Sequence, residues 1–232
     1  MGANAILGIG PFVRDCGDAC ALPSNDSGNP GLYYSCVSTS CQITSEPVAQ
    51  QIANPVALFA KDNNGVIVEL PAVSAATASV SGSLVFGIGT QSNNGINAKD
   101  VFPLNSNAEF STTFHGQSYP GFIDSGSNGL FFLNSSTSSL PVCPDTSSFY
   151  CPTSPANLSA TTTSNGVSAT VNFMVQNADS LFSNTSASVF PGLAGPNAGT
   201  FDWGLPFFFG RSVFTAIESR STPAGTGPYW AF

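Results

Sequence analysis

Apolar residues along this chain come in short runs of β-branched and aromatic side chains, and clusters of Gly, Pro, Asn and Ser separate the runs. Runs of this length, bounded by turn-forming residues, are typical of β-strands. We expect strands over residues 5–12, 56–60, 66–70, 83–88, 101–104, 109–114, 119–123, 130–133, 160–163 and 167–175, and a last edge strand over 227–232. Residues 201–218 form the densest apolar stretch of the chain. The pattern therefore predicts an all-β fold with a few short helices.

Turn and helix signals join these runs. Asn63-Asn64-Gly65 and Asn165-Gly166 are hairpin signals, and His115-Gly116-Gln117 predicts a turn between two strands. A short helix is expected over residues 46–53, where a proline stands in the first turn and an Asn-Pro pair follows the end. A helical turn is expected over residues 178–182.

One acidic residue has unusual neighbours. The apolar pair Phe122-Ile123 leads directly into Asp124, a Ser-Gly-Ser-Asn-Gly turn follows over residues 125–129, and the chain leaves along the apolar run 130–133. Glycines allow a tight turn there, and hydroxyls can donate hydrogen bonds to a carboxylate. Asp-Ser-Gly is also an ordinary turn sequence. A second copy at residues 26–28 has no apolar flanks, so we predict a plain loop there.

Composition narrows the classes of function. The 232 residues are 42% hydrophobic and only 8% charged, with a net charge of −8 and five basic residues. Such a chain can bury a large core and is too apolar for a disordered stalk. Because the chain has no basic stripe, nucleic acid is not an expected partner. No apolar run approaches the ~20 residues that a membrane span needs.

No cofactor or metal motif is apparent. The glycine-rich residues 125–129 lack the lysine of a phosphate-binding loop. His115, the only histidine, has no Gly-x-Ser-x-Gly elbow or nearby cysteine with which to build a catalytic triad. We therefore predict no cofactor and no metal.

The six cysteines fall into three close pairs, which are Cys16 and Cys20, Cys36 and Cys41, and Cys143 and Cys151. Three local disulfides are the simplest of the fifteen possible connectivities. A zinc site built from the first four cysteines is the alternative. Disulfides imply an oxidising compartment, so we expect a secreted or periplasmic protein. Residues 1–10 do not read as an export signal, which suggests that the chain has lost its beginning.

The turn over residues 122–127 resembles the active-site loop of pepsin-like aspartic proteases, whose two lobes each contribute one such aspartate. Residues 5–10 resemble a strand near the end of the first lobe, and residues 47–60 and 83–87 resemble the entry into the second lobe. Residues 203–218 resemble the strand and helical turn after the second active-site loop. The family has a glycine after two apolar residues in this strand. When the sequences are matched in this way, Pro206 stands at the position of that glycine, or Gly210 supplies the glycine if the match is shifted.

More narrowly, nearly the whole chain is similar to a group of exported bacterial proteins of unassigned function that carry a pepsin-like pattern. The resemblance implies a pepsin-like (acid protease) lobe over residues 55–232. Residues 1–54 would then be the tail of a truncated first lobe and a Cys-rich connecting loop.

The same resemblance implies roles in the turn. Asp124 would be one catalytic acid, Ser125 would brace the interface between lobes, Gly126 would donate backbone hydrogen bonds, and Ser127 would bond the outer oxygen of Asp124. Hydrolysis of a peptide or protein substrate by this route needs two carboxylates close enough to share a proton. Because residues 1–232 contain no second acid turn with an apolar entry strand, we expect the isolated chain to be inactive without its missing N-terminal lobe.

Two alternatives stay open. The chain could be a secreted, non-catalytic binding or structural β module that keeps the lobe fold. It could also pair with a second copy, as retroviral proteases do, although the first-lobe remnant at residues 5–12 makes a symmetric interface awkward.

Overall fold

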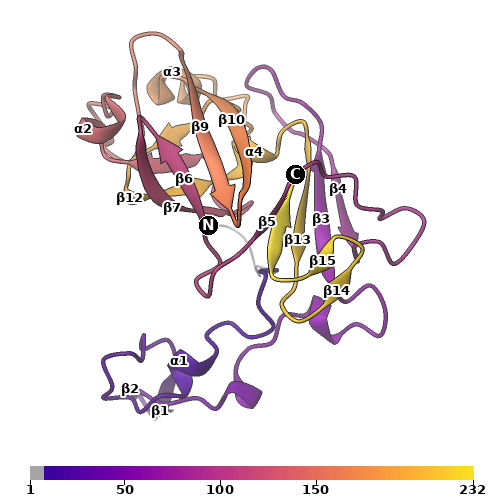
Figure 1. The fold of residues 1–232 in the computed structure, drawn as a ribbon. Helices are drawn as coiled ribbons and strands as arrows, with labels where there is room; N and C mark the ends of the chain where they lie inside the picture. Colours follow the sequence, from indigo (N-terminus) through magenta and orange to yellow (C-terminus); the bar gives the residue numbers. More distant parts are fainter. Residues whose placement is uncertain (1–7) are drawn as a thin grey trace.

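A computed structural model describes residues 8–232, and most of their regular structure is β-strand arranged in two main sheets (Figure 1). The helices are short. Four are α-helices and two are 3-10 helices, namely α1 (Asp18–Ala21), α2 (Ser135–Ser138), α3 (Ala178–Phe182), α4 (Leu205–Phe208), η1 (Val48–Gln50) and η2 (Val56–Leu58). The prediction of an all-β fold with a few short helices is confirmed at this level.

The larger sheet has seven strands. In spatial order they are β10 (Val167–Val175), β9 (Ala156–Ser164), β6 (Phe110–Phe114), β7 (Gln117–Ile123), β12 (Asn197–Trp203), β8 (Leu130–Leu133) and β11 (Ala194–Gly195). β12 runs parallel to β7 and antiparallel to β8. It therefore separates two strands that follow each other along the chain.

Two predicted turns of this sheet are confirmed. β6 and β7 form a hairpin whose loop is His115-Gly116, and β9 and β10 form another around Asn165-Gly166. All four loop residues have positive φ, between 46° and 81°. Positive φ at both loop positions suits the right-handed twist of the strands, which is why Asn-Gly is favoured there.

The smaller sheet has five antiparallel strands. In spatial order they are β4 (Ser83–Phe86), β3 (Gly65–Leu70), β13 (Arg211–Ala216), β16 (Tyr229–Ala231) and β5 (Val101–Pro103). The prediction of a last edge strand was wrong, because β16 lies between β13 and β5. Its three residues are all buried, as expected for an interior strand covered on both faces.

Four other expectations differ from the structure. Only η1 forms within the helix expected over residues 46–53, and η2 replaces the strand expected over 56–60. Asn64 makes no hairpin turn. It is buried, and its side chain donates to the Ile88 carbonyl at 2.9 Å and accepts from the Ile88 N–H at 2.8 Å. Of the strand expected over 5–12, residues 5–7 lie outside the described part, and residues 8–12 carry no strand.

The main core lies between the two sheets and is strongly aromatic. Phe132 stacks on Phe201 at a ring separation of 5.0 Å, and Phe201 stacks on Trp203 at 5.4 Å. The indole N–H of Trp203 donates to the buried Thr112 hydroxyl at 3.3 Å. Trp230 of the smaller sheet belongs to the same buried cluster. The two sheets therefore share one core.

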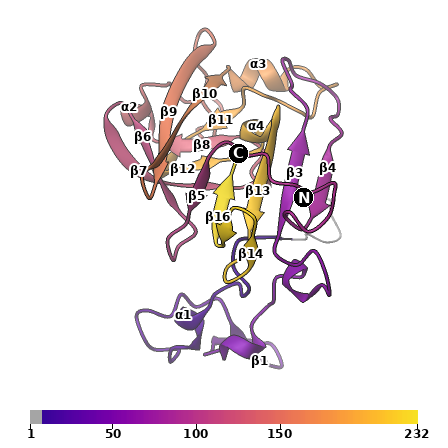
Figure 2. The same cartoon turned by 45° about the vertical axis from the view of Figure 1, so that its right-hand side comes forward.

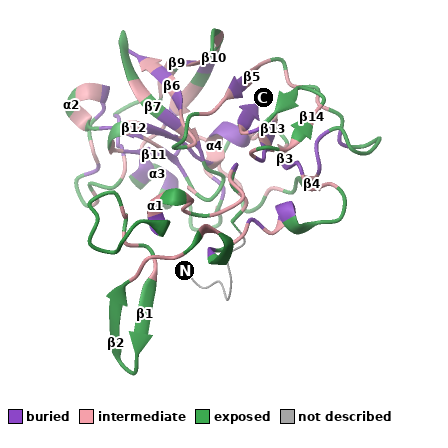
Figure 3. Cartoon of the chain, turned by 60° about the horizontal axis from the view of Figure 1, so that its bottom comes forward, coloured by how far each residue is buried: buried purple, intermediate pink, exposed green. Residues whose placement is uncertain are grey.

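The segment that carries α1, β1 (Tyr34–Val37) and β2 (Ser40–Ile43) lies below both sheets in Figures 1 and 2. β1 and β2 form a hairpin, and every residue of these two strands is exposed (Figure 3). A second small hairpin, β14 (Ser221–Thr222) with β15 (Gly225–Thr226), follows β13.

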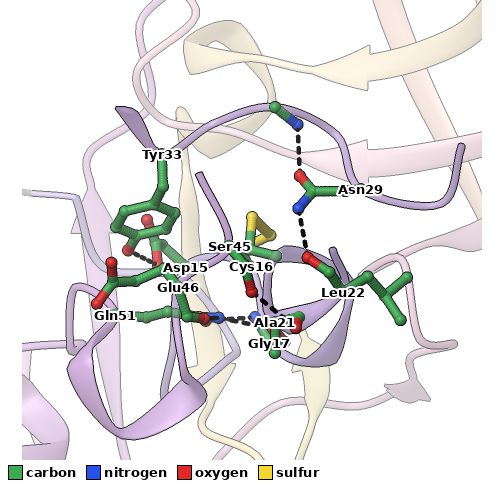
Figure 4. Close-up of a disulfide and its surroundings, with 12 residues drawn as sticks. Asp15, Cys16, Gly17, Ala21, Leu22, Asn29, Tyr33, Ser45, Glu46 and Gln51 are labelled. Atoms are coloured by element: carbon green, nitrogen blue, oxygen red, sulfur yellow. Dashed lines mark hydrogen bonds between the residues drawn. A yellow bond between two sulfur atoms is a disulfide. The ribbon is translucent and has the colours of Figure 1, made fainter. Parts of the chain in front are cut away.

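The buried amide of Gln51 holds the first disulfide region together (Figure 4). Its NH2 group donates to the carbonyls of Gly17 at 2.7 Å and Glu46 at 2.9 Å, and its oxygen accepts from the Gly17 N–H at 2.7 Å. Nearby, the Tyr33 hydroxyl donates to Asp15 at 2.7 Å. Side-chain hydrogen bonds thus join the loop around the first disulfide to residues 33 and 46–51.

All three predicted disulfides are present, joining Cys16 to Cys20, Cys36 to Cys41 and Cys143 to Cys151. The zinc alternative was wrong, because its four sulfurs are bonded in pairs. Three disulfides indicate an oxidising environment, extracellular or periplasmic. Within residues 8–232, no helix has the length and apolar character needed to cross a bilayer.

Candidate active site

Asp124 follows the last residue of β7, at the point where the crossing strand β12 also ends. Its backbone N–H donates to the Trp203 carbonyl at 3.2 Å, and the Ser127 carbonyl accepts from the Leu205 N–H at 2.7 Å. These two bonds attach residues 124 and 127 of the turn to the segment that passes behind it. The turn over residues 124–129 is therefore braced by the buried end of β12 and is not a free surface bend.

The crossing needs a glycine at residue 204. A Cβ atom on Gly204 would lie 2.0 Å from the carbonyl oxygen of Gly129 and 2.8 Å from that of Ser127. The expectation that Pro206 or Gly210 would hold this place was wrong. Pro206 lies in the first turn of α4, and Gly210 packs beside Ala72.

The Asp124 carboxylate accepts two hydrogen bonds from its own turn. Oδ1 accepts from the Gly126 N–H at 2.8 Å, and Oδ2 accepts from the Ser127 hydroxyl at 3.1 Å. These are the hydrogen bonds that the resemblance implies for Gly126 and Ser127. Ser125 is exposed beside Asp124. The catalytic roles of the four residues, and the bracing role of Ser125, stay predictions.

Asp26-Ser27-Gly28 shows what the same tripeptide does without strands around it. The Gly28 N–H donates to Asp26 Oδ1 at 2.8 Å, the same local bond as at Asp124. All three residues are exposed and lie in an irregular turn, as predicted. The local hydrogen bond is therefore common to both copies, and the bracing by β12 belongs to the Asp124 turn.

Asp202 is a second carboxylate at this site and was not among the residues predicted from the sequence. It lies on β12, its side chain is only 7% exposed, and Oδ2 lies 2.5 Å from the Ser127 hydroxyl oxygen. Ser127 thus contacts the carboxyl groups of both Asp124 and Asp202. The signal in the sequence was a lone acid between the buried aromatics Phe201 and Trp203.

Asp202 is held in an environment that favours its protonated form. Burial raises its pKa from 3.8 to about 6, the Ser127 hydrogen bond opposes that rise, and the charge of Asp124 adds to it. The other oxygen, Oδ1, is buried and has no hydrogen-bond partner among residues 8–232. An ionised carboxylate is costly in such a place.

A cavity of about 370 Å³ opens beside the acid turn. Asp124, Ser125 and Gly126 form one wall. The other walls are mostly apolar and come from the smaller sheet, α4 and the N-terminal segment, with Val66, Val68, Leu84, Phe208, Trp230 and residues 8–11. Its size lies within the range of ligand-binding clefts, so the exposed carboxylate faces a space that an apolar group could fill.

Other candidate groups lie elsewhere. His115 is in the β6–β7 loop, at the end of β7 opposite to Asp124, and stacks on Phe114 at 3.9 Å. Among the described residues, Cys143, Cys151 and Asp179 form one cluster of metal-binding residue types. Both sulfurs of that cluster belong to a disulfide and so offer no thiolate.

Comparison with known proteins gives one family. A family model described as "Protein of unknown function (DUF3443)" matches residues 1–232. No curated protein matches the chain.

Proposed function

The chain belongs to the DUF3443 family, and we propose that it is the C-terminal part of an exported aspartic-peptidase-like protein in which Asp124 is one half of a two-aspartate site. One observation carries the proposal. An exposed carboxylate, held by hydrogen bonds from Gly126 and Ser127, stands at an apolar cavity on a turn that β12 braces from behind. This arrangement fixes a reactive group on rigid strands while leaving it open to water and substrate.

The proposed reaction is hydrolysis of a peptide bond. One carboxylate takes a proton from a water molecule as the water oxygen attacks the peptide carbonyl, and a second carboxyl gives its proton to the carbonyl oxygen. The C–N bond of the resulting diol then breaks as the first carboxyl returns its proton to the amine nitrogen and the second carboxylate takes a hydroxyl proton back. Asp202 cannot be the second catalytic group, because it is buried behind the turn. The second carboxyl would therefore come from another lobe of the intact protein and approach Asp124 from its exposed side.

The rest of the chain fits this proposal as follows. Residues 55–232 would form the pepsin-like C-terminal lobe, and residues 1–54 would connect it to the first lobe. The three disulfides agree with a secreted or periplasmic protein.

The test is cleavage of an unfolded protein substrate at acid pH by the longest natural protein that contains this chain. Asp124→Asn should lower the rate by about 100-fold or more, since it removes a proton-transferring group. Asp26→Asn is the matched control, because it changes the other Asp-Ser-Gly turn, and it should leave the rate unchanged. Pepstatin-insensitive cleavage by the 232-residue chain alone would refute the assignment.

A non-catalytic binding module is the second candidate, and the β1–β2 hairpin favours it. Its apolar side chains Tyr34, Val37 and Ile43 are 57%, 78% and 44% exposed, as at surfaces that contact other molecules. Under this alternative, neither the wild-type protein nor Asp124→Asn cleaves any substrate, and the two behave alike in every other assay.

A further inference from the structure

We propose that Asp202 is a positioning residue, which controls through the Ser127 hydroxyl how many hydrogen bonds the Asp124 carboxylate receives. The importance of this control for catalysis rests on the proposed function, whereas the control itself is a property of the folded chain. The side chains of Asp202, Ser127 and Asp124 lie in this order from the interior outward, and of the three only Asp124 lines the cavity.

The Ser127 hydroxyl has a single proton and lies between two carboxyl groups. Its oxygen lies 2.5 Å from Asp202 Oδ2 and 3.1 Å from Asp124 Oδ2. A hydroxyl donates one hydrogen bond and accepts up to two, whereas an ionised carboxylate only accepts. With Asp124 ionised, both contacts can be full hydrogen bonds only if Asp202 carries a proton and donates it to Ser127.

Two states follow. When Asp202 is protonated, its Oδ2–H donates to Ser127 Oγ, and the Ser127 O–H donates to Asp124 Oδ2. When Asp202 releases that proton to solvent, the Ser127 O–H turns to the nearer and more buried Asp202 carboxylate. Asp124 then keeps the Gly126 N–H and loses the hydroxyl. The change breaks one side-chain hydrogen bond to Asp124 without moving the backbone.

The surroundings of Asp202 place this change in an accessible pH range. Its pKa is raised to about 6 chiefly by burial, and the one charge that acts on it is that of Asp124. Its neighbours in register are Phe122 on β7 and Phe131 on β8, and β8 and α4 contain no titratable residue. The other strand paired with β12, which is β7, contains one titratable residue, Tyr119.

The experiment follows the amide signal of Gly126 by NMR while the 232-residue chain is titrated from pH 5 to 8. That N–H donates to Asp124 Oδ1, so it reports the state of the Asp124 carboxylate. We expect a step near pH 6 that coincides with the titration of the Asp202 carboxyl carbon. Asp202→Asn should abolish the step, because the asparagine amide can donate to Ser127 at every pH.

The serine variants decide whether the hydroxyl carries the effect. Ser127→Ala should abolish the Gly126 step while Asp202 still titrates, and Ser127→Thr, which keeps a hydroxyl, should retain the step. A step that survives in Ser127→Ala, or one that is unchanged in Asp202→Asn, would overturn the proposal. If Ser127→Ala does not give a folded spectrum, Asp202→Asn and Ser127→Thr decide the outcome. No substrate is involved, so a protein without peptidase activity could still pass this test.

Discussion

Replacing Asp202 by Asn should make the protein more stable at neutral pH. The folded-state pKa of about 6 lies above the ordinary value of 3.8, so the folded protein binds this proton more tightly than the unfolded chain does. The resulting contribution to the free energy of unfolding is fully present below about pH 4, falls as the pH rises toward 6, and is absent above that range. The loss amounts to roughly 2–3 kcal/mol, since one pKa unit corresponds to about 1.4 kcal/mol.

Asparagine keeps the shape of the side chain and cannot ionise. The stability of Asp202→Asn relative to wild type should therefore increase by roughly 2–3 kcal/mol between pH 3.5 and pH 8. In melting temperature this difference is about 4–12 °C for a chain of this size.

Urea unfolding followed by tryptophan fluorescence, with the disulfides intact, measures the difference at each pH. Comparing variant with wild type cancels the contributions of other carboxylates. Asp26→Asn, an exposed change of the same kind, should show no such trend. The reasoning fails if the stability difference between Asp202→Asn and wild type is the same at pH 3.5 and pH 8, or if wild type gains stability relative to the variant as the pH rises.

Two further changes test the packing around the site and the role of the disulfides. Gly204→Ala should lower the free energy of unfolding, measured in urea, by about 3 kcal/mol, because its Cβ would lie 2.0 Å from the Gly129 carbonyl oxygen. Gly95→Ala is the control. It has open space around its Cβ and should lower the free energy of unfolding by less than about 1 kcal/mol. Removing the buried Cys143–Cys151 disulfide should cost about 2–4 kcal/mol. Removing Cys36–Cys41, which lies in a hairpin exposed on both strands, should lower the free energy of global unfolding by less than about 1 kcal/mol. Equal losses for the two disulfides would contradict the prediction that the buried one contributes more.

Local signals predicted the parts of the fold that depend on neighbouring residues. The Asn165-Gly166 hairpin, the helical turn at 178–182 and the acid turn between two apolar runs are in the structure as expected. In each case the residues that set the backbone geometry lie within a few positions of the element. The close cysteine pairs are predictable for the same reason.

Long-range pairing could not be read from the sequence. Phe201-Asp202-Trp203 gives no local sign that it will lie between β7 and β8, about 75 residues earlier, and so Asp202 was missed as a neighbour of Ser127. The strand expected at 56–60 failed because Asn54 intervenes. Its side-chain oxygen accepts from the Val56 N–H at 3.1 Å and directs the chain into η2.

The position of β12 between β7 and β8 also affects the order in which the sheet forms during synthesis. A ribosome releases both of those strands long before residues 197–203 emerge, so the nascent polypeptide has an open gap where the sheet will later be continuous. Closing such a distant contact is a slow step in folding. The acid turn therefore gains its bracing only after residues 197–205 have emerged, and a product terminated before them would lack the bonds from Trp203 and Leu205 to the turn.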